Sequence, residues 1–262
     1  MRVVRTILLA CLALVAMLAV AVPASAAGGS YVALGDSYSS GTGAGDYGDS
    51  GSCKRSANSY AQLWANSHGV SSFTFAACSG AVTSDVLNSQ VNSLSGDTSV
   101  VTITIGGNDA SFSDVMIDCI TSLSDDGCID RVNEAEDFAR TTLTGRLDQT
   151  YDAIRSHAPS AQVYVLGYPR FYQVPGSCSV GLSDAKRTAI DGGADTLDGI
   201  ISDRAAAAGF TFVDVRGAFT GHEICSDDVW LHSVTVPIDE SYHPTAEGQS
   251  GGYYASLNGV TG

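Results

Sequence analysis

Basic residues are scarce in this sequence. Its 262 residues include 13 lysines and arginines against 28 aspartates and glutamates, which gives a formal net charge of −15 at pH 7. Binding to nucleic acid needs a basic footprint, and electrostatic docking on anionic membranes needs clusters of lysine or arginine. The composition therefore predicts no nucleic-acid partner and no attraction to anionic lipid.

Long apolar runs are scarce as well, and the one present lies at the start of the chain. Ile7 to Val22 is apolar throughout, Arg2 and Arg5 precede it, and the small residues of Ala24 to Ala26 follow. This order is typical of a secretory signal peptide. A run of about 16 apolar residues is shorter than the ~20 that a spanning helix needs. We therefore expect residues 1–26 to be a signal peptide and the protein to be secreted, with no stable membrane anchor.

The sequence has no internal repeat and no low-complexity linker, so we expect residues 27–262 to form one domain. Short apolar runs typical of strands alternate with helical patterns. The expected strands are Tyr31–Leu34, Phe73–Ala76, Val100–Ile105, Gln162–Leu166 and Phe210–Val215. The expected helices are Ser59–Ser67, Val82–Leu94, Val132–Ser156, Leu182–Ala208 and a last one from Thr245. This alternation predicts an α/β fold, a three-layer α/β/α sandwich around a parallel sheet. In open sheets of this kind the site lies at the carboxyl ends of the strands.

Paired C-x-x-C spacing, which a structural zinc site would use, is absent. Six cysteines remain once the leader and Cys11 are removed, an even number that indicates disulfides in an oxidising compartment. The only crowded set of possible metal ligands is His222, Glu223 and Cys225. We expect no metal and no cofactor.

The tripeptide Gly-Asp-Ser occurs twice, ending at Ser37 and at Ser50. Ser50 lies in a Gly-Asp-Ser-Gly sequence like that of trypsin-like proteases, but those place their histidine upstream, and no histidine precedes Ser50. Ser37 does not fit the G-x-S-x-G elbow of α/β-hydrolases, because Ser39 stands where glycine is required. Ser37 does follow the first expected strand directly, where a tight turn could expose its hydroxyl. We interpret Ser37 as the candidate nucleophile and Ser50 as part of a turn.

A serine nucleophile needs a base, and five histidines are available. His68 and His157 lie at the ends of expected helices, where the helix dipole favours them. His222 and His232 lie in a loop region and can be structural. His243 stands before a proline, which biases it to an extended backbone, and just ahead of the last expected helix. His243 is therefore the preferred candidate base.

Four blocks of sequence, taken together, resemble the SGNH or GDSL hydrolases. They are "YVALGDSYSSG", "ACSGA", "TIGGNDA" and "SYHPTA", in this order along the chain. With "CKRS", their flanks are similar to those of secreted actinobacterial lipases and esterases. The resemblance covers almost all of residues 27–262 and implies the flavodoxin-like fold of that family.

The resemblance implies a role for each block. Ser37 would be the nucleophile and His243 the general base, and later the general acid. The oxyanion donors would be the backbone N–H groups of Ser37 and Gly80 and the side-chain amide of Asn108. These residue types suit the chemistry, since a tetrahedral intermediate needs fixed donors where negative charge develops. We interpret Asp36 as an acid that braces the loop.

One position departs from the family pattern. Many members place aspartate three residues before the histidine, where this chain has Glu240, with Asp239 beside it. Some relatives instead orient the histidine with a main-chain carbonyl. Both alternatives stay open here, and we favour the carbonyl of Ser241 over the Glu240 carboxylate.

The resemblance also implies disulfides in sequence order. The expected pairs are Cys53–Cys78, Cys119–Cys128 and Cys178–Cys225. The second pair has local support, because its cysteines bracket a short polar loop between helical stretches.

The sequence therefore predicts a monomeric, secreted carboxylic-ester hydrolase, a lipase or esterase that acts on small-molecule or lipid acyl esters. The alternatives are a carbohydrate esterase that removes acetyl groups and a non-catalytic binding module on the same fold. We expect loops such as Phe171–Gly181 and Gly221–Pro237 to form the walls of the substrate pocket.

Overall fold

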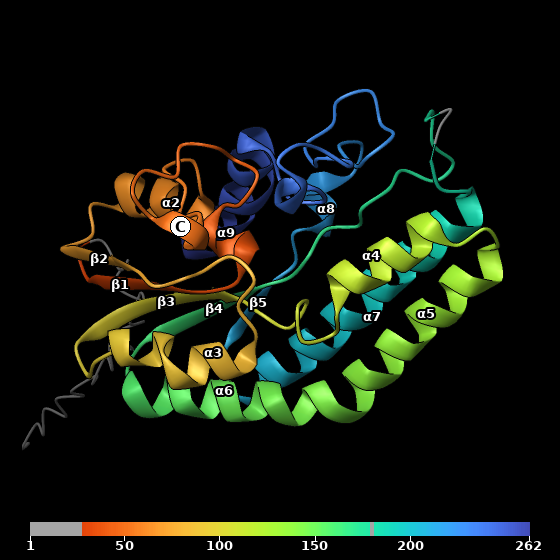
Figure 1. Ribbon diagram of the computed structural model, residues 1–262. Coiled ribbons are helices and arrows are strands. Elements are labelled where there is room, and N and C mark those ends of the chain that lie inside the picture. Colours follow the sequence, from red (N-terminus) through yellow and green to blue (C-terminus); the bar gives the residue numbers. More distant parts are fainter. Residues whose placement is uncertain (1–27, 179–180) are drawn as a thin grey trace, which may run out of the picture.

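The central layer of the computed structural model is a sheet of five parallel strands in the order β2-β1-β3-β4-β5 (Figure 1). The structure describes residues 28–178 and 181–262, so the expected signal peptide, 1–26, lies outside the described residues. The strands are β1 (Ser30–Gly35), β2 (Ser72–Phe75), β3 (Thr98–Thr104), β4 (Gln162–Leu166) and β5 (Thr211–Val213). All five expected strands are confirmed, with ends that differ by a few residues.

The middle strand β3 explains why these sequences form a parallel sheet. Its side chains are buried almost throughout, because helices cover both faces. In register, Val101 pairs with Val32 of β1 on one side and with Val163 of β4 on the other. All three of these valines are buried, so the β-branched run supplies the core of the sheet.

Helices lie on both faces of the sheet, which confirms the three-layer arrangement. Figure 1 shows α2 and α9 above the strands and α3 and α6 below them. The α-helices are α1 (Ser37–Ser40), α2 (Tyr60–His68), α3 (Thr83–Asn88), α4 (Phe112–Thr121), α5 (Asp125–Phe138), α6 (Thr144–His157), α7 (Asp184–Ala207), α8 (Arg216–Phe219) and α9 (Ala255–Thr261).

Serine and threonine side chains begin several of the expected helices. Ser59 Oγ accepts the N–H of Gln62 at the start of α2, and Ser183 Oγ accepts that of Lys186 at the start of α7. Thr245 Oγ1 accepts the N–H of Gly248, so the last helical stretch does begin where the sequence predicts. That stretch continues through a π-helical segment, Gly248–Tyr254, into α9.

Two helix predictions need correction. The expected helix Val82–Leu94 breaks at Ser89, whose φ is −135°, and continues only as a 3₁₀ turn over Gln90–Ser93. The break places the Gln90 side chain against the backbone of Gly35. The expected helix Val132–Ser156 begins earlier, because Ser124 caps α5, and runs through a π-helical segment, Ala139–Leu143, into α6.

Helix α4 was not predicted, although it shapes the molecule. Figure 1 shows α4, α5 and the first half of α7 extending past the carboxyl end of the sheet.

Three disulfides join Cys53 to Cys78, Cys119 to Cys128 and Cys178 to Cys225. These are the pairs that the resemblance implies. Among the described residues, none of the helices combines the length and apolar character needed to span a membrane.

Candidate active site

The turn that follows β1 presents Ser37. Gly35 has a φ of +118°, and a Cβ there would lie 2.4 Å from the carbonyl oxygen of Thr104, so only glycine fits. Asp36 then caps α1 by accepting the N–H of Tyr38 at 3.0 Å. Ser37 is the first residue of α1 and is buried apart from 5% of its surface.

Asp36 braces this turn from below, as expected. Besides capping α1, its carboxylate accepts hydrogen bonds from the hydroxyls of Thr104 and Tyr168. Complete burial raises the pKa of Asp36 to about 6, although all three donors favour the charged form. Asp36 has no hydrogen bond to the imidazole of His243 within the described residues. Its position indicates a structural role.

His243 lies against Ser37 although the two are 206 positions apart. Its Nε2 is 2.7 Å from Ser37 Oγ, and its Nδ1 is 3.0 Å from the carbonyl oxygen of Ser241. A carbonyl can only accept, so Nδ1 carries the proton and Nε2 is left as an acceptor for the serine hydroxyl. The loop is held in place by Tyr38, whose hydroxyl donates to the carbonyl of Tyr242 at 2.6 Å. This arrangement can take the proton of the Ser37 hydroxyl.

The two acids near the histidine have other partners. Glu240 Oε1 accepts from the Tyr47 hydroxyl at 2.9 Å and from Lys54 Nζ at 3.2 Å. Asp239 Oδ2 lies 2.8 Å from the same Lys54 Nζ, which holds the pKa of Asp239 below its usual value. Both acids therefore anchor the loop that carries the Ser241 carbonyl.

Gly80 and Asn108 meet Ser37 at the same cavity. Gly80 has a φ of +80°, a left-handed conformation that favours glycine. Within residues 28–178 and 181–262, no protein acceptor takes the backbone N–H of Ser37 or of Gly80. The Asn108 amide donates one hydrogen to the carbonyl of Ala81 at 3.0 Å and keeps the other available. The structure thus places three available donors in the lining of one cavity.

The remaining histidines lie in structural positions. His68 and His157 end α2 and α6, where their Nδ1 atoms contact backbone carbonyls one turn earlier. His222 stacks on Trp230, and His232 bonds the carbonyl of Gly43 through Nε2 at 2.8 Å.

The second Gly-Asp-Ser serine and the crowded cysteine also have structural partners. Ser50 Oγ donates to the carbonyl of Tyr47 at 2.6 Å and accepts the N–H of Arg55 at 2.8 Å. Ser50 therefore braces a turn. Cys225 forms a disulfide with Cys178, so it has no free thiolate with which to bind a metal alongside His222 and Glu223.

Two buried glutamines that the sequence analysis missed hold the Ser37 turn. Gln90 bonds both the N–H and the carbonyl of Gly35, at 2.6 and 2.9 Å. Gln249 accepts the N–H of Tyr60 and donates to the carbonyl of Tyr38. Both side chains are at most 5% exposed. A glutamine at an otherwise apolar helix position is the only sequence signal for them, and it is a weak one.

A cavity of about 230 Å³ opens beside Ser37 and His243. Its walls are mostly apolar side chains of the three helices that extend past the sheet. They come from α4 (Phe112, Val115), α5 and the segment after it (Val132, Ala135, Ala139) and α7 (Ile190, Gly193, Ala194, Leu197). The predicted walls were largely wrong. Phe171 does contribute, but no residue of Gly221–Pro237 lines the cavity, and most of the lining comes from α4, α5 and α7.

Several known proteins are similar to this chain in sequence and fold. Residues 33–250 match the GDSL-like Lipase/Acylhydrolase family. The chain is 55% identical to a lipase of Streptomyces rimosus over 232 residues, which are 88% of this chain and 86% of that protein. The crystal structure of phospholipase A1 from Streptomyces albidoflavus superimposes with a TM-score of 0.86 at 57% identity, covering 89% of this chain and 99% of that one. The extracellular lipase of Streptomyces rimosus gives a TM-score of 0.85 at 55% identity, covering 88% and 99%.

The pH profile of ester hydrolysis should report the surroundings of His243. Desolvation in the site lowers the pKa of His243 from 6.5 to about 4. A base must be neutral, so a lower pKa keeps it active at more acidic pH. We expect kcat/KM to fall only as the pH drops through about 4. The released acid is measured by chromatography, because p-nitrophenol absorbs poorly at low pH.

The variant His157→Gln should leave this acid limb where it is, since His157 lies at the far end of α6. A limb near 6.5 would show an unperturbed histidine. A limb near 6 that disappears in Asp36→Asn would assign control to Asp36 instead. Either result contradicts the expected profile.

Proposed function

Since the chain belongs to the GDSL-like Lipase/Acylhydrolase family, we propose that Ser37 and His243 are the catalytic pair of a secreted carboxylic-ester hydrolase. The distance of 2.7 Å between Ser37 Oγ and His243 Nε2 carries this proposal. Export agrees with the cysteines, because all six in the described residues are paired.

The reaction proceeds in two halves. His243 Nε2 takes the proton of the Ser37 hydroxyl while Oγ attacks the ester carbonyl carbon. The tetrahedral intermediate collapses as the ester C–O bond breaks, and His243 returns the proton to the departing alcohol. A water molecule then gives a proton to His243 and attacks the carbonyl carbon of the acyl-enzyme. The bond from that carbon to Ser37 Oγ breaks, His243 returns the proton to Oγ, and the carboxylic acid leaves. No cofactor takes part in this sequence.

The negative charge of each intermediate falls on the former carbonyl oxygen. The N–H groups of Ser37 and Gly80 and the free amide hydrogen of Asn108 are the donors for it. Such donors act strongly because they are fixed before the charge develops, and removing one typically costs ~2.7–4 kcal/mol. The hydrogen bond from Asn108 to Ala81 fixes the direction of the amide, and Asp109 holds the same loop through Thr83 and Arg146.

The carbonyl of Ser241 orients the imidazole in this proposal. It selects the tautomer with the proton on Nδ1 and stabilises the imidazolium that forms when Nε2 is protonated. Glu240 does not contact the imidazole in this proposal, because its carboxylate is hydrogen-bonded to Tyr47 and Lys54. It anchors the loop that carries the Ser241 carbonyl. No side-chain substitution can remove the Ser241 carbonyl.

The apolar cavity indicates the substrate class. Most of its walls are aliphatic or aromatic, and it adjoins the proposed nucleophile, so it suits a hydrocarbon chain. An acetyl group would leave most of that surface empty. We therefore propose that the cavity binds the acyl chain of a lipid ester, in preference to the acetyl groups of a polysaccharide.

The first prediction separates the two Gly-Asp-Ser serines. Ser37→Ala should lower kcat for p-nitrophenyl butyrate at least ~10³-fold, because the nucleophile is lost. Ser50→Ala should stay within about twofold of the parent chain, since Ser50 only braces a turn. A fluorophosphonate should label the parent and the Ser50 variant but not Ser37→Ala. Equal losses in the two variants would contradict the assignment.

The second prediction concerns the orientation of His243. His243→Ala should lower kcat at least ~10³-fold, whereas Glu240→Gln and Asp239→Asn should each cost less than ~10-fold. In a carboxylate triad, loss of the acid's charge can cost ~10⁴-fold. A loss in Glu240→Gln as large as that in His243→Ala would establish Glu240 as the third member of a triad.

The third prediction tests the acyl cavity with a pair of neighbouring glycines in α7. A Cβ at Gly193 would lie 3.0 Å from Val132 Cγ1, whereas a Cβ at Gly192 would have nothing within 4 Å. Gly193→Val should therefore narrow the cavity and lower the ratio of kcat/KM for decanoate to that for butyrate at least ~10-fold. Gly192→Val carries the same helix penalty but should keep the ratio of the parent. Equal ratios would place the acyl chain elsewhere.

A further inference from the structure

Most of the exposed large aliphatic side chains lie in three segments: α4 with the turn after it, the segment after β4, and the segment between α8 and the last helix. The described residues include nine exposed large hydrophobic residues, and Val260 in α9 is the only one outside these segments. The other eight form what we call the aliphatic rim: Ile117, Ile120, Leu123, Val174, Val229, Val234, Val236 and Ile238. Isolated exposed aliphatics are common, whereas several on segments that pack against one another indicate an interaction surface.

The rim residues do not line the acyl cavity themselves, but each belongs to a segment in which other residues do. Helix α4 contributes Phe112 and Val115, the segment after β4 contributes Phe171, and the segment before the last helix contributes Asp239 and His243. The three segments that carry the rim are therefore also segments that border the substrate cavity.

Aromatic contacts hold the three segments together. The ring centroids of Phe112 and Phe171 are 4.7 Å apart. Tyr242 lies 6.4 Å from Phe112 and 6.4 Å from Tyr172, so its ring joins all three. In Figure 1, α4 and the segment between α8 and the last helix both lie above α7.

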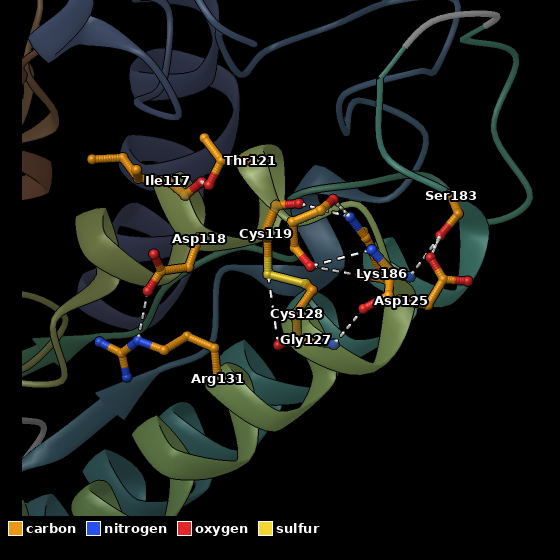
Figure 2. Close-up of a disulfide and its surroundings, with 12 residues drawn as sticks. Ile117, Asp118, Cys119, Thr121, Asp125, Gly127, Cys128, Arg131, Ser183 and Lys186 are labelled. Carbon is orange, nitrogen blue, oxygen red and sulfur yellow. Dashed lines mark hydrogen bonds and ion pairs between the residues drawn. A yellow bond between two sulfur atoms is a disulfide. The ribbon is translucent and has the colours of Figure 1, made fainter.

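The tip between α4 and α5 is firmly held although its leucine is in solvent. The Cys119–Cys128 disulfide joins the two helices (Figure 2). Lys186 donates to the carbonyls of Cys119 and Ser122, at 2.9 and 2.7 Å, and so neutralises the carboxyl end of α4. Leu123, the next residue, is fully exposed, with a relative accessibility of 105%. Figure 2 shows Ile117 on the side of α4 away from the disulfide.

This rigidity makes the exposed side chains effective for binding. A leucine on a mobile tip would lose conformational entropy when it is buried in a partner, whereas a fixed one loses little. The aliphatic side chains of α4 therefore stand ready for an apolar environment outside the protein.

The charges near the rim limit the kind of partner. Asp114 and Asp118 lie on α4, and Asp227, Asp228 and Asp239 lie on the segment before the last helix. The chain as a whole has a net charge of −15. Lys54, which contacts the segment before the last helix, is neutralised by Asp239 and Glu240. An anionic surface would be repelled, whereas a neutral or zwitterionic surface would not.

We propose that the aliphatic rim docks this protein on the surface of a neutral or zwitterionic lipid aggregate. Docking buries the exposed leucine, isoleucines and valines among the lipid chains. It also brings the cavity to the interface, so that an acyl chain passes from the lipid to Ser37 without crossing water. The role of the rim in substrate delivery rests on the proposed function, but the docking itself does not depend on catalysis.

The test measures binding to phosphatidylcholine vesicles in the Ser37→Ala chain, which does not consume the lipid. Leu123→Ser and Val236→Ser alter two separate segments of the rim, and Val260→Ser is the matched control in α9. Each rim variant should lower the vesicle partition coefficient about tenfold, because burying one such side chain contributes roughly that factor. Val260→Ser should bind like its parent. Vesicles of phosphatidylglycerol should bind less well than those of phosphatidylcholine.

Hydrolysis of monomeric p-nitrophenyl butyrate, measured with Ser37 intact, should stay within about twofold in all three variants. Equal vesicle binding by Leu123→Ser, Val236→Ser and Val260→Ser would overturn the proposal. So would tighter binding to phosphatidylglycerol. Sedimentation in which Leu123→Ser dissociates a dimer, with unchanged lipid binding, would assign the rim to a second copy of the chain. A chain that binds vesicles but hydrolyses no ester would refute the proposed function and leave the docking intact.

Discussion

The short contact between Ser37 Oγ and His243 Nε2 is the interaction on which the site depends, and it joins two ends of the domain. Hydrogen bonds from side chains to backbone carbonyls maintain it. The Tyr38 hydroxyl holds the histidine loop, and Gln249 in the last helical stretch holds the backbone of Tyr38. Gly43 allows the histidine loop to pack closely against the first loop, because a Cβ at this position would lie 3.0 Å from His243 Cβ. The dyad is therefore a product of how the first and last elements pack.

The polar groups around His243 have separate partners. The carbonyl of Ser241 meets the imidazole, and the nearby acids are occupied by Lys54. Lys54 follows Cys53, whose disulfide partner Cys78 lies two residues before Gly80. One covalent link thus connects the anchor of the histidine loop with the strand end that leads to Gly80, the proposed oxyanion donor. Desolvation lowers the pKa of His243, and Lys54 offsets the charge of the two nearby acids.

The sheet and the helices beyond it serve different purposes. Ser37 and Asn108, to which we assign roles in the chemistry, follow the carboxyl ends of β1 and β3, which is where open α/β sheets place their sites. The apolar space for a substrate chain comes from α4, α5 and α7, which extend past the sheet. The disulfide between Cys119 and Cys128 and the ammonium group of Lys186 keep that extension ordered. The same extension carries part of the aliphatic rim, so substrate space and lipid contact belong to one structural unit.

Local patterns in the sequence determined the five strands, the helix that Thr245 begins, and the position of Ser37 directly after a buried strand, because each depends on backbone periodicity or capping by near neighbours. Three features depended on the tertiary structure alone. Helix α4 has no strong cap and was missed, since Ser111 begins it in a left-handed conformation without a side-chain bond. The walls of the cavity come from helices that meet only in the folded chain. The Nδ1 atom of His243 contacts the Ser241 carbonyl, while Glu240 is hydrogen-bonded to Tyr47 and Lys54, about 190 residues away. No local pattern predicts this, because the position of the Glu240 carboxylate depends on partners that are distant in the sequence.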